Sequence, residues 1–157
     1  MSRAFVKEDD PTGGAVVLAD RPISPHPNLV TRRGLRLIEA RVAELERLIA
    51  GTAADTDDRA ALARELRYWS ARRSTAQVEE PAAPVRAVRF GTTVTVRRPD
   101  DTTVRLAIVG EDEAEPAAGR IAWTAPAARA LLGAEPGEVR AMPAGEVEIV
   151  AVETGGE

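Results

Sequence analysis

The sequence has no cysteine and only one histidine, His26. Without cysteine there are no disulfides, no thiolate metal sites and no cysteine nucleophile. A single histidine argues against a histidine-based metal cluster and against the usual Ser/His/Asp triad. His26 also lies between Pro25 and Pro27, where a solvent-exposed side chain is expected rather than a catalytic one. We therefore expect that the chain is not itself an enzyme.

Aromatic residues and long apolar runs are scarce too. Aromatics make up 3% of the 157 residues, so any core must consist mainly of Val, Leu, Ile and Ala. No apolar run reaches the length of a signal-peptide core or a membrane span. With 44% hydrophobic and 29% charged residues, the composition suits one compact domain with an appendage or two small domains. We expect a cytoplasmic protein without a membrane partner.

Lysine is almost absent, since Lys7 is the only one and nearly all positive charge comes from arginine. The formal net charge is -4, and the arginines are interspersed with acidic residues. A protein that holds nucleic acid by its phosphates needs a broad basic surface. The charge pattern instead indicates a solvated mixed surface and no direct sequence-specific binding of nucleic acid.

The N-terminal half divides into an arm and a helical hairpin. Residues 1–30 are rich in proline, glycine and charge and have no periodicity, which indicates an extended or disordered arm. From an N-cap at Thr31 to a stop at Gly51, apolar residues recur at steps of three and four. Leu62, Leu66 and Trp69 continue this spacing to about Gln77. Residues 31–78 are therefore predicted to form an antiparallel coiled-coil hairpin.

The C-terminal half changes to strand periodicity after a Pro/Ala-rich linker at residues 79–86. Alternating apolar residues predict four strands. A short helix is expected from Pro126 to a stop at Gly133. This predicts an α+β fold, in which residues 87–153 form a small antiparallel sheet with one helix and residues 154–157 form a tail. The predicted strands cover residues 90–98, 102–110, 119–125 and 145–153.

Acidic residues gather in "IVGEDEAEPAAG", residues 108–119, where Glu111, Asp112, Glu113 and Glu115 lie close in sequence. Such a group of carboxylates suits a hard cation in principle. The run lacks the spaced oxygen ligands of a calcium loop, so a solvated turn between strands is the better interpretation.

A second acidic group, Asp55, Asp57 and Asp58, falls at the turn between the two predicted helices. Asp and Thr are favoured N-caps, and acids in a first helical turn are stabilised by the helix dipole by about 0.3 to 1 kcal/mol each. Asp55 or Thr56 is expected to cap the second helix, with the other two aspartates in its first turn. That arrangement requires no function.

Several ordered segments carry a family resemblance. "FGTTVTV", "IVGEDEAE", "GRIAWTAPAARALLG" and "VEIVAVE" resemble the C-terminal domain of the Gre transcript-cleavage factors (GreA and GreB) of bacterial RNA polymerase. "VTRRGLRLIEARVAEL" and "STAQV" resemble the opening and the return of the Gre helical hairpin. The resemblance implies a monomer whose coiled-coil hairpin enters the polymerase secondary channel, and an FKBP-like domain that grips the polymerase at the channel mouth.

The resemblance also assigns roles to residues. In the family, an acidic pair spaced Asp-x-x-Glu at the hairpin tip helps to hold the second magnesium ion of the polymerase. Asp55 and Asp58 reproduce this spacing with Asp in place of Glu, and Asp57 is an additional candidate; the free protein needs no metal or other cofactor. Hard divalent ions prefer such charged oxygen ligands. For docking on the polymerase, the resemblance points to Glu111, Asp112, Glu113, Pro126 and Arg129. Pro126 and Arg129 also fit an ordinary first helical turn with a solvated arginine.

The hairpin departs from the Gre pattern in length and at the tip. It is shorter by about ten residues per arm, or about 15 Å of reach, and "DTDDRA" has no lysine or asparagine. A short hairpin of this kind resembles the Rnk proteins, regulators of nucleoside diphosphate kinase that bind polymerase without promoting cleavage. The leading hypothesis is therefore a polymerase-binding elongation regulator that does not promote cleavage.

Two alternatives stay open. One is a cleavage-stimulating factor that donates the tip aspartates to the second magnesium ion of the polymerase. The other is a protein-interaction module unrelated to polymerase, which recruits a partner through the proline-rich arm. A peptidyl-prolyl isomerase is disfavoured, because Phe90 and Trp123 are too few aromatics to line a proline pocket.

Overall fold

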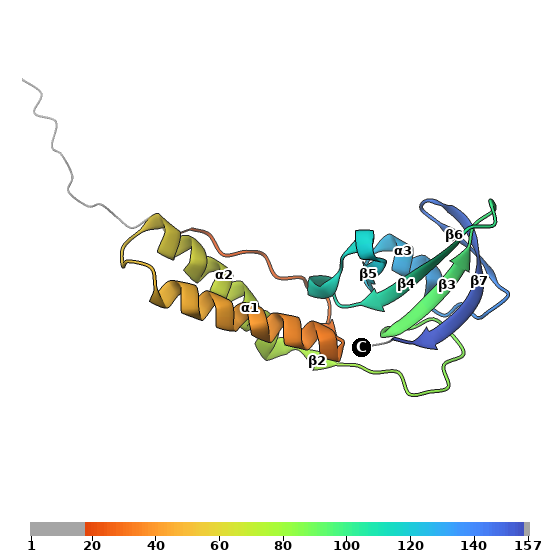
Figure 1. The fold of residues 1–157 in the computed structure, drawn as a ribbon, viewed down its shortest axis with the longest axis horizontal. Coiled ribbons are helices and arrows are strands. Elements are labelled where there is room, and N and C mark those ends of the chain that lie inside the picture. The colour runs from red at the N-terminus through yellow and green to blue at the C-terminus, as the bar shows by residue number, and fades with distance from the viewer. Residues whose placement is uncertain (1–17, 156–157) are drawn as a thin grey trace, which may run out of the picture.

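The structure is a computed structural model of the chain, and residues 18–155 are described. It confirms the α+β class. Two long helices, α1 (Arg32–Ala50) and α2 (Asp57–Thr75), lie side by side at one end of an elongated molecule, and a curled sheet with the short helix α3 (Pro126–Leu131) lies at the other (Figure 1).

Helix α1 begins and ends where its sequence predicts. The Thr31 side chain accepts a hydrogen bond from the Gly34 amide at 2.9 Å, and the Gly51 amide donates to the last carbonyls of the helix. The apolar stripe of α1 is buried at Ile38, Val42 and Leu45. Helix α2 buries no equivalent stripe, because its apolar side chains are only half-buried. The hairpin is thus present, whereas its coiled-coil character stays a prediction.

The described part of the arm is extended and ordered against α2. Figure 1 shows the segment from residue 18 onward running beside the hairpin. Arg21 pairs with Glu65 at 2.7 Å, and Arg67 pairs with Asp20 at 2.5 Å. Residues 1–17 lie outside the described part, so the arm prediction applies there without a test. Polar contacts of this kind leave no periodicity, so this order could not be predicted from the sequence.

The arm ends in a short strand that the sequence did not predict. Strand β1 (Leu29–Val30) pairs in parallel with β2 (Gln77–Val78), directly after α2. The Gln77 amide donates to the Asn28 carbonyl at 2.9 Å, and the Glu79 amide donates to the Val30 carbonyl at 3.0 Å. The two ends of the hairpin are therefore joined at its base.

The C-terminal sheet is mixed rather than antiparallel. Its order is β5-β4-β3-β7-β6, and β5 runs parallel to β4 while the other pairs are antiparallel. The antiparallel prediction was wrong at β5, because the chain crosses back through two 3₁₀ helices, η1 (Glu111–Glu113) and η2 (Pro116–Ala118). Strand β6 was missed, since it is short and lies at the sheet edge. The strands are β3 (Thr92–Arg97), β4 (Thr103–Val109), β5 (Arg120–Ala122), β6 (Val139–Met142) and β7 (Gly145–Thr154).

The core of this half is aliphatic, as the low aromatic content predicted. Helix α3 begins with Pro126 in its first turn and packs Ala128 and Leu131 against the sheet. Trp123 lies partly buried at the edge of this core. Within residues 18–155, no helix has the length and apolar character that a bilayer span requires. The buried core consists of Val88, Val94, Val96, Ile108, Ile121, Ala128, Leu131, Ala134, Val147 and Ile149.

Truncation of Ile149, which is 0% exposed, tests this core. We expect Ile149→Ala to lower the free energy of unfolding by about 2 to 5 kcal/mol, because it removes buried methyl groups and leaves a cavity. Val139 on the edge strand is 62% exposed, so Val139→Ala is the matched control, with a change within about 0.5 kcal/mol. Urea unfolding measures both. Equal losses would contradict the assigned core.

Candidate functional site

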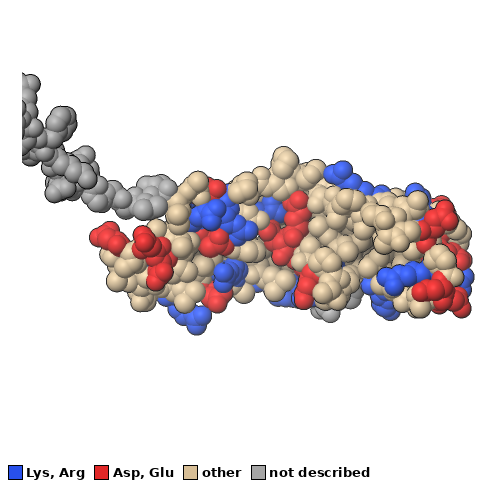
Figure 2. Space-filling view, turned by 90° about the horizontal axis from the view of Figure 1, so that it is seen from above, with Lys and Arg blue, Asp and Glu red and all other residues tan. Residues whose placement is uncertain are grey.

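Two groups of acidic side chains bear on the hairpin, one at its tip and one at its junction with the sheet domain. Figure 2 shows them at its free end and again midway along the molecule, where the helices meet the sheet domain. The first place is the tip, residues 51–58. The second is the acidic turn, residues 111–113, which forms η1. The two places differ in whether their carboxylates have partners.

At the tip, Thr56 rather than Asp55 caps α2. The Thr56 hydroxyl accepts a hydrogen bond from the Arg59 amide at 3.2 Å, and Asp57 and Asp58 occupy the first helical turn. Asp55 precedes the cap with φ 59°, in the left-handed region that Asp tolerates better than most residues. The helix dipole stabilises the two first-turn carboxylates, so the capping interpretation is confirmed for Thr56.

All three tip aspartates are exposed. Within residues 18–155, no hydrogen bond or ion pair engages their carboxylates, and no three acidic or histidine side chains form a cluster that could hold a metal ion. The tip therefore offers free carboxylate oxygens rather than a complete cation site. Such oxygens fit a magnesium ion whose other ligands come from a partner.

The acidic turn is packed against the base of the hairpin. Arg72 of α2 is 2% exposed, and its Nε donates to Asp112 Oδ2 at 2.5 Å while Nη2 lies 3.5 Å from Glu111 Oε2. The Tyr68 hydroxyl donates to the other oxygen of Asp112 at 2.6 Å. One buried guanidinium thus pairs with two carboxylates that come from the other half of the chain.

Glu113 is the most buried acid of the turn, at 6% exposed. Its oxygens accept hydrogen bonds from the Thr31 hydroxyl at 2.5 Å and from Arg33 Nη1 at 3.0 Å. A Cβ at Gly34 would lie 2.7 Å from Glu113 Oε2, so glycine gives the carboxylate room beside α1. Thr31 serves both purposes, since it caps α1 and binds the acidic turn.

The arm also contacts this junction. The Ser24 hydroxyl donates to Glu111 Oε1 at 3.0 Å, and the Thr124 hydroxyl donates to the same oxygen at 3.1 Å. The ring of His26 meets the ring of Trp123 edge-on, with 5.8 Å between centroids. His26 is therefore half-buried against the sheet domain, and the prediction of a solvent-exposed side chain was wrong.

The interpretation of residues 111–113 as a solvated turn was also wrong. Sequence spacing could not reveal the contacts, because Arg72 and Tyr68 lie about forty residues away. Asp112 and Glu113 face the hairpin, whereas Pro126 and Arg129 at the start of α3 are exposed. Only the α3 residues keep the geometry expected of an outward docking surface.

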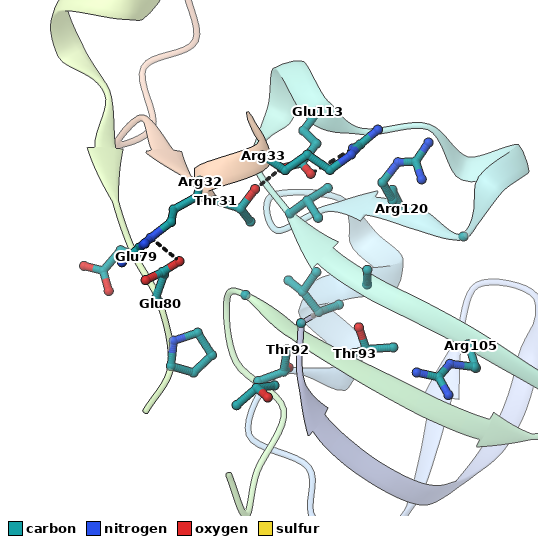
Figure 3. Close-up of a pocket in the computed structure, with 18 of the residues that line it drawn as sticks. Thr31, Arg32, Arg33, Glu79, Glu80, Thr92, Thr93, Arg105, Glu113 and Arg120 are labelled. Atoms are coloured by element: carbon teal, nitrogen blue, oxygen red, sulfur yellow. Dashed lines mark hydrogen bonds and ion pairs between the residues drawn. The ribbon is translucent and has the colours of Figure 1, made fainter. Parts of the chain in front are cut away.

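A cleft of about 620 Å³ opens beside the junction (Figure 3). It lies between the start of α1, the segment after β2, and the ends of β3, β4 and β5. Its labelled arginines all pair with carboxylates: Arg32 with Glu80, Arg33 with Glu113, Arg105 with Glu153, and Arg120 with Glu115. The cleft is consequently a polar opening without unpaired cations among these arginines.

Tyr68 provides a spectroscopic test of the junction, because it is the only tyrosine. Burial and the hydrogen bond to Asp112 raise the pKa of Tyr68 to about 12. At pH 11 we expect tyrosinate absorbance to show Tyr68 mostly protonated, and Asp112→Asn to lower its pKa only part of the way toward about 10, because burial, the larger cause, remains. The folded state holds this proton longer, so the associated stability is full below about pH 10 and is lost as pH rises toward about 12. An unchanged pKa in the variant would contradict the contact.

The buried ion pair gives a second prediction. Asp112→Ala leaves the Arg72 guanidinium buried with only the longer contact to Glu111, so we expect the free energy of unfolding to fall by about 3 kcal/mol. Glu153→Ala breaks an exposed pair with Arg105 and should cost at most about 1 kcal/mol. Denaturant unfolding compares the two. Similar losses would mean that the junction contributes no more than a surface pair.

Comparison with known proteins places the C-terminal half. Residues 83–154 match the family described as "Transcription elongation factor, GreA/GreB, C-term". The chain is 40% identical over 93 residues to transcription elongation factor GreA of Pseudomonas aeruginosa, covering 56% of this chain and 59% of that protein. It is 36% identical over 96 residues to GreB of Neisseria meningitidis serogroup B, covering 57% and 59%. The chain thus spans less than two thirds of these relatives.

Among solved structures, the GreA factor homolog Gfh1 of Thermus thermophilus aligns with 82% of this chain and 99% of its own, at 19% identity and a TM-score of 0.41. The similarity to this family rests on the C-terminal match and on the GreA and GreB relatives. Residues 83–154 are thus similar to the C-terminal domain of the GreA/GreB transcription elongation factors.

Proposed function

We propose that the protein is a transcription elongation regulator that binds bacterial RNA polymerase and places its hairpin in the secondary channel. One observation carries the proposal: a Gre-type C-terminal domain bears a two-helix hairpin whose tip presents three free carboxylates. The relatives named GreA and GreB are transcription elongation factors. The polymerase supplies all chemistry in this proposal, and the protein acts as a monomer in the cytoplasm.

The two halves of the molecule have separate tasks. The C-terminal domain, which the resemblance describes as FKBP-like, docks on the polymerase through the exposed start of α3, at Pro126 and Arg129. The hairpin reaches inward; each helix has 19 residues, or about 28 Å at the helical rise. A hairpin of this length occupies the channel whether or not it reaches the active centre.

The acidic turn has a different role from the one expected on resemblance. Because Asp112 and Glu113 bind the hairpin, they set the direction of the hairpin relative to the docking domain. Contacts at the base of the hairpin thereby restrict the movement of its tip relative to the sheet domain. Glu111 joins the same contacts through Ser24 and Thr124. We propose that all three acids orient the hairpin.

The hairpin is shorter than the Gre pattern, and this favours regulation without cleavage. By occupying the channel, the protein excludes other factors that enter there and alters pausing, in the manner of Rnk-type regulators. Carboxylates ligate magnesium only at about 2.0 to 2.1 Å, so a tip that stops short contributes no ligand.

Stimulated cleavage is the second candidate function, and the free carboxylates at the tip favour it. Asp55 and Asp58 would hold a magnesium ion jointly with the polymerase. Such an ion stabilises charge on the attacking or leaving oxygen during phosphodiester hydrolysis. The residues of this chain would only orient it.

An assay on a stalled, backtracked elongation complex separates these functions. We expect the wild type to suppress cleavage by an authentic Gre factor, with little cleavage of its own. The Asp55→Asn, Asp58→Asn variant should suppress equally, because channel occupancy does not need the charges. Asparagine is preferred to alanine because Asp55 has a positive φ. Stimulation by the wild type that this variant loses by about tenfold or more would establish cleavage instead.

Controls come from the hairpin shaft. Glu39→Gln, Glu46→Gln removes two exposed charges from α1 away from the tip, and should behave as wild type in either case. Absence of any effect of the wild type on polymerase would overturn the proposal and direct attention to a partner of the arm.

A further inference from the structure

Arg59 connects the two helices and the loop at the hairpin tip. Its Nη1 donates to the Ile49 carbonyl at 3.0 Å and to the Thr52 carbonyl at 2.8 Å. The first acceptor belongs to the last turn of α1, and Arg59 itself belongs to the first turn of α2. A cation at a helix C-terminus is favoured by the dipole, and its charge strengthens the hydrogen bonds. One side chain therefore ties both helices to the loop between them.

Hydroxyl groups complete the same arrangement. The Thr56 hydroxyl accepts from the Arg59 amide and donates to the Ala53 carbonyl at 3.0 Å. The Thr52 hydroxyl donates to the Leu48 carbonyl at 2.7 Å. Both halves of the loop are thereby fixed to helix ends, and Asp55 lies between them at φ 59°. Few backbone conformations remain open to Asp55 under these constraints.

The direction of the guanidinium is informative. Arg59 follows Asp57 and Asp58 directly in sequence, yet no ion pair joins it to any tip aspartate in the described structure. The guanidinium instead donates hydrogen bonds to main-chain carbonyls. The loop is stabilised by a cation while the three carboxylates stay available.

We propose that Arg59 is a positioning residue, which fixes the shape of the loop that the hairpin presents inside the polymerase channel. This inference rests on the proposed function, because it concerns the tip inside the channel. It adds a residue that touches neither metal nor RNA but determines how the tip loop is held between the two helices.

Two variants and a control test it. Arg59→Ala removes the donor, Arg59→Lys keeps a donor and the charge, and Arg73→Ala removes an exposed arginine from the other end of α2. The first measurement is amide hydrogen exchange by NMR on the free full-length protein. We expect the Thr52 and Arg59 amides to exchange about tenfold faster in Arg59→Ala, as expected for loss of a charge-assisted hydrogen bond. Arg59→Lys should return toward wild type, and Arg73→Ala should match it.

The second measurement is the effect on elongation complexes as a function of protein concentration. We expect Arg59→Ala to lower the maximal effect several-fold and leave the half-saturating concentration unchanged, because docking lies elsewhere. A merely structural role would move both, as hairpin unfolding would; helicity by circular dichroism identifies that case and would also overturn the inference. Partial rescue by Arg59→Lys supports positioning.

The outcomes separate the inference from the function on which it rests. Unchanged exchange at the tip in Arg59→Ala would overturn the inference even if the wild type regulates polymerase. Faster exchange with an unchanged maximal effect would also overturn it, since tip order would then be irrelevant. If the wild type has no effect on polymerase, the proposed function fails and the positioning role with it. The exchange data still decide whether Arg59 holds the loop.

Discussion

The structure depends on one buried guanidinium, that of Arg72. It comes from α2, whereas its carboxylate partners come from the acidic turn of the sheet domain. Removing a charge from water is costly unless hydrogen bonds and an opposite charge compensate. The two halves of the chain must therefore meet in one arrangement, in which Asp112 reaches Arg72 and Tyr68 together. Apolar contact alone would tolerate sliding; this pair does not.

The same constraint explains how the scarcity of aromatics is accommodated. Neither half buries a large aromatic cluster, and the sheet core consists of aliphatic side chains. The junction between the halves instead uses arginine, aspartate, glutamate and hydroxyl groups, with the arm laid over it. Arg21 stacks on the Tyr68 ring at 3.7 Å and pairs with Glu65, so even the main aromatic contact of the arm involves a cation.

Local signals in the sequence predicted local structure well. The cap at Thr31, the stop at Gly51 and the start of α3 at Pro126 follow from residue chemistry within one turn. The strand prediction succeeded wherever apolar residues alternate, and it missed β6 because "VRAM" is short and half exposed. The parallel pairing of β5 was beyond reach, since it depends on the path of the chain through η1 and η2. At the tip, the placement of Asp57 and Asp58 in the first turn of α2 follows from local residue chemistry, whereas the burial of Asp112 and Glu113 depends on partners distant in sequence.

The pairing of β1 with β2 closes the hairpin at its base, so that the chain enters and leaves the two helices at nearly the same point. The helices can then gain or lose residues without disturbing the sheet domain, provided that both change by equal amounts. Seven residues added to each helix would extend the hairpin by about 10 Å and would preserve the face that carries Ile38, Val42 and Leu45. The reach of the hairpin is therefore set by the length of its helices and not by the contacts at its base.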